Sequence, residues 1–272
     1  MKNYILHVLC IFFISFFISS CNEDDYQPQY AYEARPEFLA GNKIGIIVVH
    51  GFTGSPQSMR PVAHKLNDLG YTIVLPLLEG HGSTPEIMEK TTYKDWANTV
   101  HQAYTLLKPK VDKIFVLGLS MGGTQSLHLA ANYPVDGAIV INASVSTSPY
   151  EPLPEYDGYP RFLDGIGSDI KKPGVTEWAY KKVPLLCRES MDEFKEITSK
   201  ELNKIACPVL IFRSIDDHVV DPETSIYIYN NLFNIERALI NLENSYHVAT
   251  LDYDQDLIVE KSHEFIQSVL DK

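Results

Sequence analysis

The sequence predicts an α/β fold in which a mostly parallel sheet carries helices on both faces. Apolar strand-like runs alternate with helix-like segments along most of the chain, and such alternation favours parallel strands joined by crossover helices. The run 44–49 is almost continuously apolar, which is typical of a strand buried on both faces. The 272 residues are 45% hydrophobic and 21% charged, values that suit a packed globular protein.

Six short apolar runs are predicted as strands from their length and composition. In chain order they are Ile44–Val49, Tyr71–Leu77, Ile114–Leu117, Ala138–Ile141, Val209–Phe212 and Ala238–Leu242. All six fall within residues 41–272, which we interpret as one domain.

Helices are expected between these strands. The segment 55–70 opens with Ser and Pro, which suit the N-cap and the first helical position. The segment 92–107 opens with Thr-Tyr-Lys-Asp, an acidic form of the capping box. A third helix should follow the strand at 114–117 and end at Tyr133, because Pro134 disfavours helix at the residue before it. A last helix is expected over roughly 254–270.

One segment interrupts this alternation. Residues from about 144 to 203 contain no strand run, and their first part is dense in Pro, Gly and Tyr. A structureless loop of this length is improbable in a compact domain, so we interpret it as an inserted cap. In its second half, apolar residues recur at spacings that suit a pair of helices. We expect some of these residues to fasten the insert to the core and others to line an acyl pocket. These residues are Val183, Leu185, Leu186, Met191, Phe194 and Ile197.

The N-terminus is typical of an export signal. A short basic start and an apolar run over 4–18 predict a signal peptide, because the run is too short for a comfortable membrane span. Residues 18–21, Ile-Ser-Ser-Cys, resemble the lipobox of bacterial lipoproteins, so 1–20 would be removed and Cys21 lipidated. The alternative is an uncleaved helical anchor. Residues 21–40 are interpreted as a tether, which predicts a membrane-anchored lipoprotein of a bacterial cell envelope, at the outer membrane or cell surface.

The net charge and the positions of His and Cys limit which ligands and cross-links the chain is expected to have. The net charge of −12 argues against nucleic acid, which binds basic surfaces. The spacings of His and Cys match no zinc pattern, so no metal or cofactor is expected. Cys187 and Cys207 would remain in the mature domain, where an envelope location permits a disulfide. Two separate buried thiols are the favoured alternative.

The segment Gly118-Leu119-Ser120-Met121-Gly122 predicts a nucleophile elbow. The pattern G-x-S-x-G alone arises by chance in about one chain in ten of this length, given the usual glycine content. Here it lies between a predicted strand and a predicted helix, where it holds a serine in a strained turn at the carboxyl edge of the sheet.

A serine nucleophile needs a base and an acid that orients the base. His247 follows the last predicted strand, whereas His128 and His263 lie inside predicted helices. Asp217 follows the strand over 209–212, and its neighbour Asp216 is the competing candidate. The order Ser120, Asp217, His247 is that of α/β hydrolases.

An oxyanion hole is expected from backbone amides. Gly51 and Gly54 flank Phe52 directly after the first predicted strand, so the Phe52 amide can approach a substrate carbonyl. The Met121 amide, directly after the nucleophile, is the second expected donor. His50 and His81 are interpreted as residues that brace these loops, and Trp96 and Trp178 as packing residues.

Four motifs carry a family resemblance: His50-Gly-Phe-Thr-Gly54, Gly118-Leu-Ser-Met-Gly-Gly123, Asp217-His-Val-Val220 and Ser245-Tyr-His-Val248. Together with Gly80-His81-Gly82 they resemble the bacterial carboxylesterase and monoacylglycerol-lipase group of α/β hydrolases. The resemblance runs from about Arg35 to the C-terminus and is faint in the insert. It implies the α/β-hydrolase fold with a cap after the sixth strand, and catalysis by the triad and two amides without metal or cofactor.

The function indicated is hydrolysis of a small-molecule carboxylic ester through an acyl-enzyme on Ser120. The same triad could serve thioester hydrolysis or another acyl transfer. A silent binding protein of the same fold is the alternative outside enzymology, but such proteins usually lack a triad residue, and all three are present here. Dehalogenases and epoxide hydrolases of this fold use an aspartate nucleophile, which the serine argues against.

Overall fold

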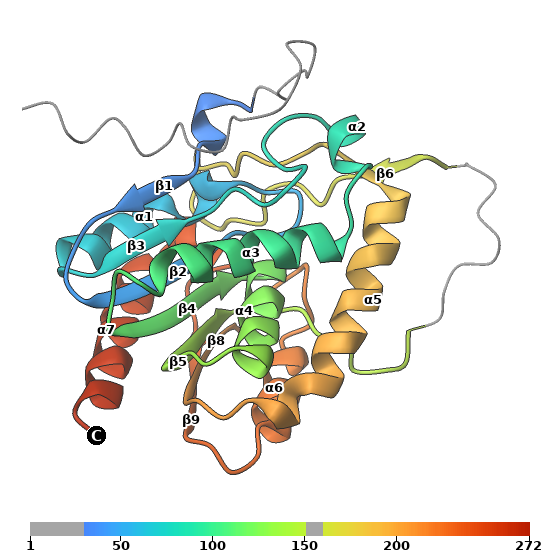
Figure 1. Ribbon diagram of the computed structural model, residues 1–272. Helices are drawn as coiled ribbons and strands as arrows, with labels where there is room; N and C mark the ends of the chain where they lie inside the picture. Colours follow the sequence, from blue (N-terminus) through green and yellow to red (C-terminus); the bar gives the residue numbers. More distant parts are fainter. Residues whose placement is uncertain (1–29, 151–159) are drawn as a thin grey trace, which may run out of the picture.

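The computed structural model describes residues 30–150 and 160–272, which form a seven-stranded sheet between two layers of helices (Figure 1). The strand order is β1-β3-β2-β4-β5-β8-β9, and every neighbouring pair is parallel except β1 with β3. The strands are β1 Glu37–Leu39, β2 Ile44–Val49, β3 Thr72–Leu75, β4 Lys113–Leu119, β5 Gly137–Ile141, β8 Val209–Ser214 and β9 Arg237–Leu242. The predicted mostly parallel sheet is confirmed.

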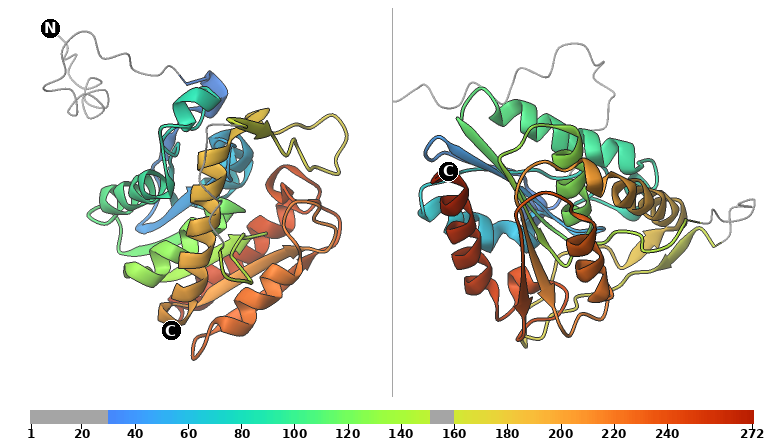
Figure 2. Two further views of the ribbon diagram at one scale, coloured as in Figure 1. Left: turned by 90° about the vertical axis from the view of Figure 1, so that its right-hand side faces the viewer. Right: turned by 90° about the horizontal axis from the view of Figure 1, so that it is seen from below.

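Helices cover both faces of this sheet. On one face lie α1 Pro56–Asp68 and α7 Gln255–Leu270, and on the other lie α3 Tyr93–Leu107, α4 Met121–Asn132 and α6 Glu223–Asn231. The view from below separates the two layers (Figure 2). Because each face of the central strands packs on helices, the apolar runs are buried on both sides, as the continuous run over 44–49 predicts.

Local signals predict the helix starts well. Thr92 and Asp95 form a reciprocal capping box at α3, with the Thr92 N–H donating to Asp95 Oδ2 at 2.8 Å. Pro56 occupies the first turn of α1. Ser55 precedes α1 without a side-chain cap bond, because its hydroxyl donates to the Trp178 carbonyl at 3.2 Å.

The expected tether over 21–40 extends too far. Within it lie the short helix η1 Tyr32–Ala34 and the strand β1, which pairs antiparallel with β3 at the sheet edge. Arg60 of α1 fastens this edge, donating from Nε to Glu37 Oε1 at 2.5 Å. A strand of only three residues carries too little pattern to be recognised in the sequence.

The insert follows β5, the fifth strand along the chain and not the sixth. It contains a two-stranded antiparallel ribbon, β6 Phe162–Asp164 with β7 Lys182–Pro184, then one helix α5 Leu185–Glu201 and the turn η2 Leu202–Lys204. The expected helix pair is therefore a single longer helix, which stands beside α3 and α4 (Figure 2). The remaining short helices are α2 Pro85–Met88 and η3 Ala249–Leu251.

The apolar residues of α5 fasten the insert. Met191 and Phe194 are buried in the same core as α3 and α4, and Phe194 stacks on the Tyr93 ring at 5.2 Å between centroids. Cys187 and Cys207 are both buried free thiols, in agreement with the favoured alternative.

The predicted signal peptide 1–20 and Cys21 lie outside the described residues. No helix in the described ranges has the length and apolar character needed to cross a bilayer.

Candidate active site

The carboxyl ends of four parallel strands bring the predicted site residues to one edge of the sheet. Phe52 follows β2, Ser120 follows β4, Asp217 follows β8 and His247 follows β9. Since parallel strands end at a common edge, residues distant in sequence meet there. Of these, Phe52, Ser120 and His247 line one small cavity of about 40 Å³.

Ser120 has the strained backbone of a nucleophile elbow, with φ 56° and ψ −120°. Non-glycine residues rarely adopt positive φ, and such outliers gather at functional sites. An added Cβ at Gly118 would overlap the Gly122 carbonyl, and one at Gly122 would overlap the Val49 carbonyl. Both glycines are therefore required by close backbone approach. The Ser120 N–H donates to the Ile141 carbonyl at 2.9 Å, which ties the turn to β5.

His247 and Asp217 form a buried pair, with Nδ1 of His247 2.8 Å from Oδ2 of Asp217. The other carboxylate oxygen of Asp217 accepts the N–H groups of Val219 and Val220 at 2.8 and 2.9 Å. With Nδ1 donating to the carboxylate, Nε2 is the nitrogen left to accept a proton. The pair thus has the geometry of a base and its orienting acid.

The neighbouring carboxylates have other partners. The Asp216 side chain is 52% exposed and lies 3.9 Å from Lys171 Nζ, whereas the Asp217 side chain is only 2% exposed. Asp221 Oδ1 accepts the Glu223 N–H at 2.9 Å at the start of α6. Among the three aspartates, only Asp217 meets His247, as the sequence predicts.

The loop after β2 is strained and leaves a donor free. Thr53 has φ 61°, which is unusual for a β-branched residue, and the turn is closed by the Gly54 N–H on the Gly51 carbonyl at 3.2 Å. Within the described part of the chain, neither the Phe52 N–H nor the Met121 N–H has an acceptor. One unpaired amide lies in the β2 loop that lines the cavity and the other follows Ser120 directly, as is typical of an oxyanion hole.

The insert closes the cavity. Ile166, Gly167 and Glu177 line it together with the strand-edge residues. The Tyr180 N–H donates to the Thr53 carbonyl at 3.1 Å, so the insert is bonded directly to the oxyanion loop. Sequence analysis missed Glu177, because no periodic pattern or motif marks its segment.

Comparison with known proteins agrees with this geometry. The sequence profile of the alpha/beta hydrolase fold matches residues 46–172. The chain is 45% identical over 234 residues to the thermostable monoacylglycerol lipase of Bacillus sp. (strain H-257), across 85% of this chain and 94% of that protein. The chain belongs to the α/β-hydrolase family. Within it the chain falls in the carboxylesterase and monoacylglycerol-lipase group, and it is a carboxylic ester hydrolase.

Two further relatives place the hydrolase in the same group. A carboxylesterase of Bacillus subtilis (strain 168) is 28% identical over 243 residues, 86% of this chain and 97% of that protein. A solved structure from work on two metagenome-derived lipolytic enzymes, LipS and LipT, is 41% identical with a TM-score of 0.83. It covers 88% of this chain and 100% of that one.

Two buried histidines brace the loops of the hydrolase. His50 Nδ1 donates to the Gly51 carbonyl at 2.9 Å, and its Nε2 accepts the Leu78 N–H at 3.2 Å. Burial lowers the pKa of His50 to about 3, with a further contribution from His81. Burial also lowers the pKa of His81 to about 4. Both rings are therefore neutral at pH 7 and act as fixed dipoles that hold the loops, in agreement with their predicted bracing role.

Asn142, directly after β5, is a second residue that sequence analysis missed. It is buried, with φ 47°, and its Nδ2 donates to the His247 carbonyl at 2.8 Å and to Ser214 Oγ at 2.9 Å. Its Oδ1 accepts the Ser214 N–H at 2.7 Å. The signal available was its place at the same strand edge, which makes a polar side chain there a candidate for ordering the loops.

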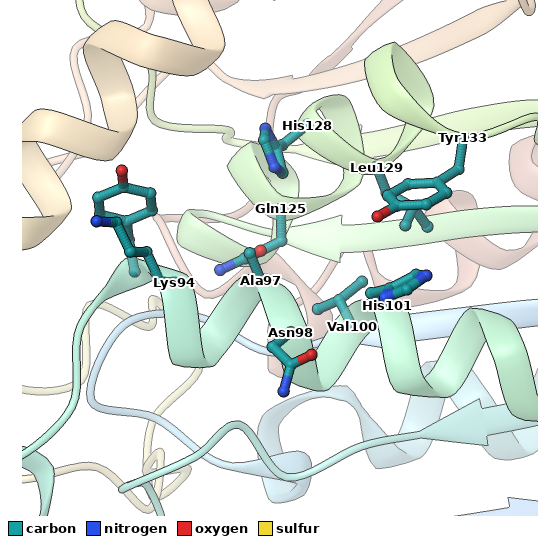
Figure 3. A pocket seen from close by; sticks show the side chains of 10 residues that line it. Lys94, Ala97, Asn98, Val100, His101, Gln125, His128, Leu129 and Tyr133 are labelled. Atoms are coloured by element: carbon teal, nitrogen blue, oxygen red, sulfur yellow. The ribbon is translucent and has the colours of Figure 1, made fainter.

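A larger hollow of about 250 Å³ lies between α3 and α4, away from the triad (Figure 3). Gln125 and His128 of α4 line it, together with Asn98 and His101 of α3. It contains neither the strained serine nor the His247 pair, so size alone does not mark the reactive site of the hydrolase. Within the described residues no group of three or more His, Cys, Asp or Glu side chains could hold a metal ion.

Proposed function

We propose that the hydrolase cleaves esters through an acyl-enzyme on Ser120. The Ser120 hydroxyl attacks the ester carbonyl while His247 Nε2 takes its proton, and Asp217 holds the imidazole and stabilises its positive charge. The Phe52 and Met121 amides bind the oxyanion of the tetrahedral intermediate. His247 then returns the proton to the leaving alcohol, and water hydrolyses the acyl-enzyme by the same steps.

The observation that carries this proposal is the 2.8 Å His247–Asp217 pair at the wall of the cavity that holds the strained Ser120. The backbone strain at a residue such as Ser120 costs about 1–3 kcal/mol, and such strain is found mainly at functional sites. Of the two amides without acceptors, that of Met121 follows Ser120 directly, and that of Phe52 lies in the loop after β2. Each feature is accounted for by acyl transfer at Ser120.

We further propose monoacylglycerols as the substrate class. Glu177 of the insert lines the same cavity as His247, where a simple alkyl ester offers it no hydrogen-bond donor. Burial raises the pKa of Glu177 above its usual value, and the hydrogen bond with Ser58 and the charge of His247 offset this rise only in part. A carboxylate here can accept the free hydroxyls of a glycerol leaving group. The similarity to a monoacylglycerol lipase supports the same substrate.

The acyl chain must extend beyond the cavity. A volume of about 40 Å³ holds little more than a water molecule, far below the roughly 300–1,000 Å³ of ligand pockets. Ile166 stands at the cavity wall and is 55% exposed, so it offers apolar surface where a chain would leave the site. This proposal replaces the expected acyl-pocket role of the α5 residues.

A substrate panel tests both proposals. We expect covalent labelling by a fluorophosphonate probe, and faster turnover of 1-monoacylglycerols than of methyl esters of the same acids. Thioesters, p-nitrophenyl esters from acetate to palmitate, and acetylated or feruloylated sugars complete the panel. If the protein is labelled but prefers thioesters or sugar esters, the proposed mechanism stands and monoacylglycerols are refuted as the substrate class. A protein that takes no label and turns over no ester would refute the mechanism itself.

The cellular location is a separate proposal that rests on the sequence alone. Residues 18–21 resemble a lipobox, so Cys21 would carry the lipid that anchors the mature hydrolase to a bacterial envelope membrane. The Cys21→Ala variant should leave the membrane fraction or accumulate as an unprocessed precursor. Unchanged size and unchanged detergent partitioning would indicate an uncleaved helical anchor instead.

A further inference from the structure

Asp169 of the insert joins the two loops that carry the acid and the base. Its Oδ2 accepts the backbone N–H of His218 and the backbone N–H of His247, each at 3.1 Å. Its Oδ1 lies 2.9 Å from His218 Nδ1, and its carbonyl accepts the Val248 N–H at 3.0 Å. Asp169 thus binds His218, which lies 49 positions later in the chain and next to Asp217, and also His247, which lies 78 positions later.

The Asp169 carboxylate has the burial and charge expected of a fixed strut. Its side chain is 15% exposed and accepts three N–H groups, so it is held in place by hydrogen bonds from both loops. The hydrogen bond to Asp169 and its charge raise the pKa of His218, as do the charges of Asp216 and Asp217. His218 is also faced by the Tyr246 ring, edge-on at 4.5 Å.

Asp252 holds the same segment from the other side. This buried carboxylate accepts the Lys171 and Lys172 N–H groups at 2.6 and 3.0 Å, and the Tyr246 N–H at 3.0 Å. The insert segment that carries Asp169 and the loop that carries His247 are therefore both bonded to Asp252. Asp169 has little freedom to follow a displaced His247 loop.

We propose that Asp169 is a positioning residue for ester hydrolysis, through which the insert sets the direction of the His247 ring relative to Asp217. The proposal rests on the proposed function. The direction of the ring depends on the position of the His247 backbone. Asp169 accepts the backbone N–H of His247, and Asn142 Nδ2 donates to the backbone carbonyl of His247. A displacement of about 1 Å in a catalytic group can cost on the order of 100-fold in rate.

The test compares Asp169→Asn with Asp216→Asn in the full-length protein. Asp216 also faces His218, at 3.6 Å, but bonds neither His247 nor its backbone. We expect Asp169→Asn to lower kcat about 10- to 100-fold with KM within about twofold, because binding is retained while the base is misdirected. Asp216→Asn should stay within about threefold of wild type on both.

A spectroscopic readout separates this inference from the choice of substrate. The proton that His247 Nδ1 shares with Asp217 should give a far-downfield proton NMR signal, and Asp169→Asn should broaden or shift it, whereas Asp216→Asn should not. The signal can be read even if wild type hydrolyses no ester, a result that would refute the proposed function alone. Wild-type kcat and an unshifted signal in Asp169→Asn would overturn the positioning role.

His218→Ala provides a second route if Asp169→Asn does not fold. The His218 side chain is exposed, so its removal spares the core while it takes one of three donors from Asp169. A smaller fall in kcat than for Asp169→Asn, about three- to tenfold with KM unchanged, supports the proposal. Wild-type kcat with an unshifted His247 signal in this variant contradicts it.

Discussion

The two halves of the insert contact different parts of the hydrolase. The first half, 160–184, lies over the carboxyl edge of the sheet, where Ile166 and Glu177 line the reactive cavity and Tyr180 bonds the oxyanion loop. The second half, α5, stands against α3 and α4, and none of its residues lines that cavity. The first half is therefore placed to contact the substrate, whereas α5 attaches the insert to the rest of the domain.

The kinds of contact differ accordingly. The first half packs Tyr180 into the core, and it is also held by polar bonds near the site. Asp169 accepts the His247 N–H, and Ser55 Oγ donates to the Trp178 carbonyl. Helix α5 is held by apolar packing and by a bond to the first residue of α3, in which the Tyr93 N–H donates to Ser190 Oγ at 2.8 Å. Changes in the first half should therefore alter selectivity and geometry, and changes in α5 should alter stability.

The largest effect is expected outside the insert altogether. Ser120→Ala should reduce ester turnover to background in a folded protein, because it removes the hydroxyl that shares the cavity with His247. Residual hydrolysis of roughly 10³–10⁴-fold over water can persist from the oxyanion hole and binding. Turnover close to wild type, measured with the same ester, would place the nucleophile elsewhere.

The orienting acid comes next in size. Asp217→Asn should lower kcat by about 10³–10⁴-fold, because the amide cannot hold the imidazole in the tautomer that leaves Nε2 free. The matched control is the exposed neighbour Asp216, and Asp216→Asn should stay within about threefold of wild type. Steady-state kinetics on one ester compares them, and the reverse order would assign the acid to Asp216.

The sequence predicts the strand-edge half of this site far better than the insert half. The nucleophile elbow, the acid and the base each follow an apolar strand, so local pattern and parallel topology suffice to bring them together. Glu177 and Asp169 follow no motif, and their roles arise only when the insert closes over the edge. Asn142 lies at the strand edge itself, but no motif marks its bonds to Ser214 and the His247 carbonyl. The apolar spacing predicted helix correctly over 185–197, but Val183 lies in strand β7. The spacing could not distinguish one helix from two, or attachment from an acyl pocket.

A smaller and more selective effect is expected in the first half of the insert. Glu177→Gln keeps the size of the side chain but removes the charge that accepts glycerol hydroxyls. We expect kcat/KM for a 1-monoacylglycerol to fall about 10-fold or more, since a hydrogen bond to a charged group contributes about 1.5–3 kcal/mol. The methyl ester of the same acid should change within about twofold, as should both substrates with the exposed α5 variant Glu193→Gln. An equal fall for both esters in Glu177→Gln would contradict an alcohol-binding role.

The smallest effect on turnover is expected in α5, where the cost should appear as stability. Phe194 is fully buried, stacks on Tyr93 and meets the His128 ring edge-on at 5.2 Å. Phe194→Ala should lower the free energy of unfolding by about 3–5 kcal/mol, because it removes the ring and leaves a cavity. Its kcat per fluorophosphonate-titrated site should stay within about twofold of wild type, with chain-length preference unchanged. Leu186→Ala, at an exposed position of the same helix, should change neither quantity. A shifted chain-length preference in Phe194→Ala, at an equal count of titrated sites, would return the acyl pocket to α5 and remove the division between the two halves.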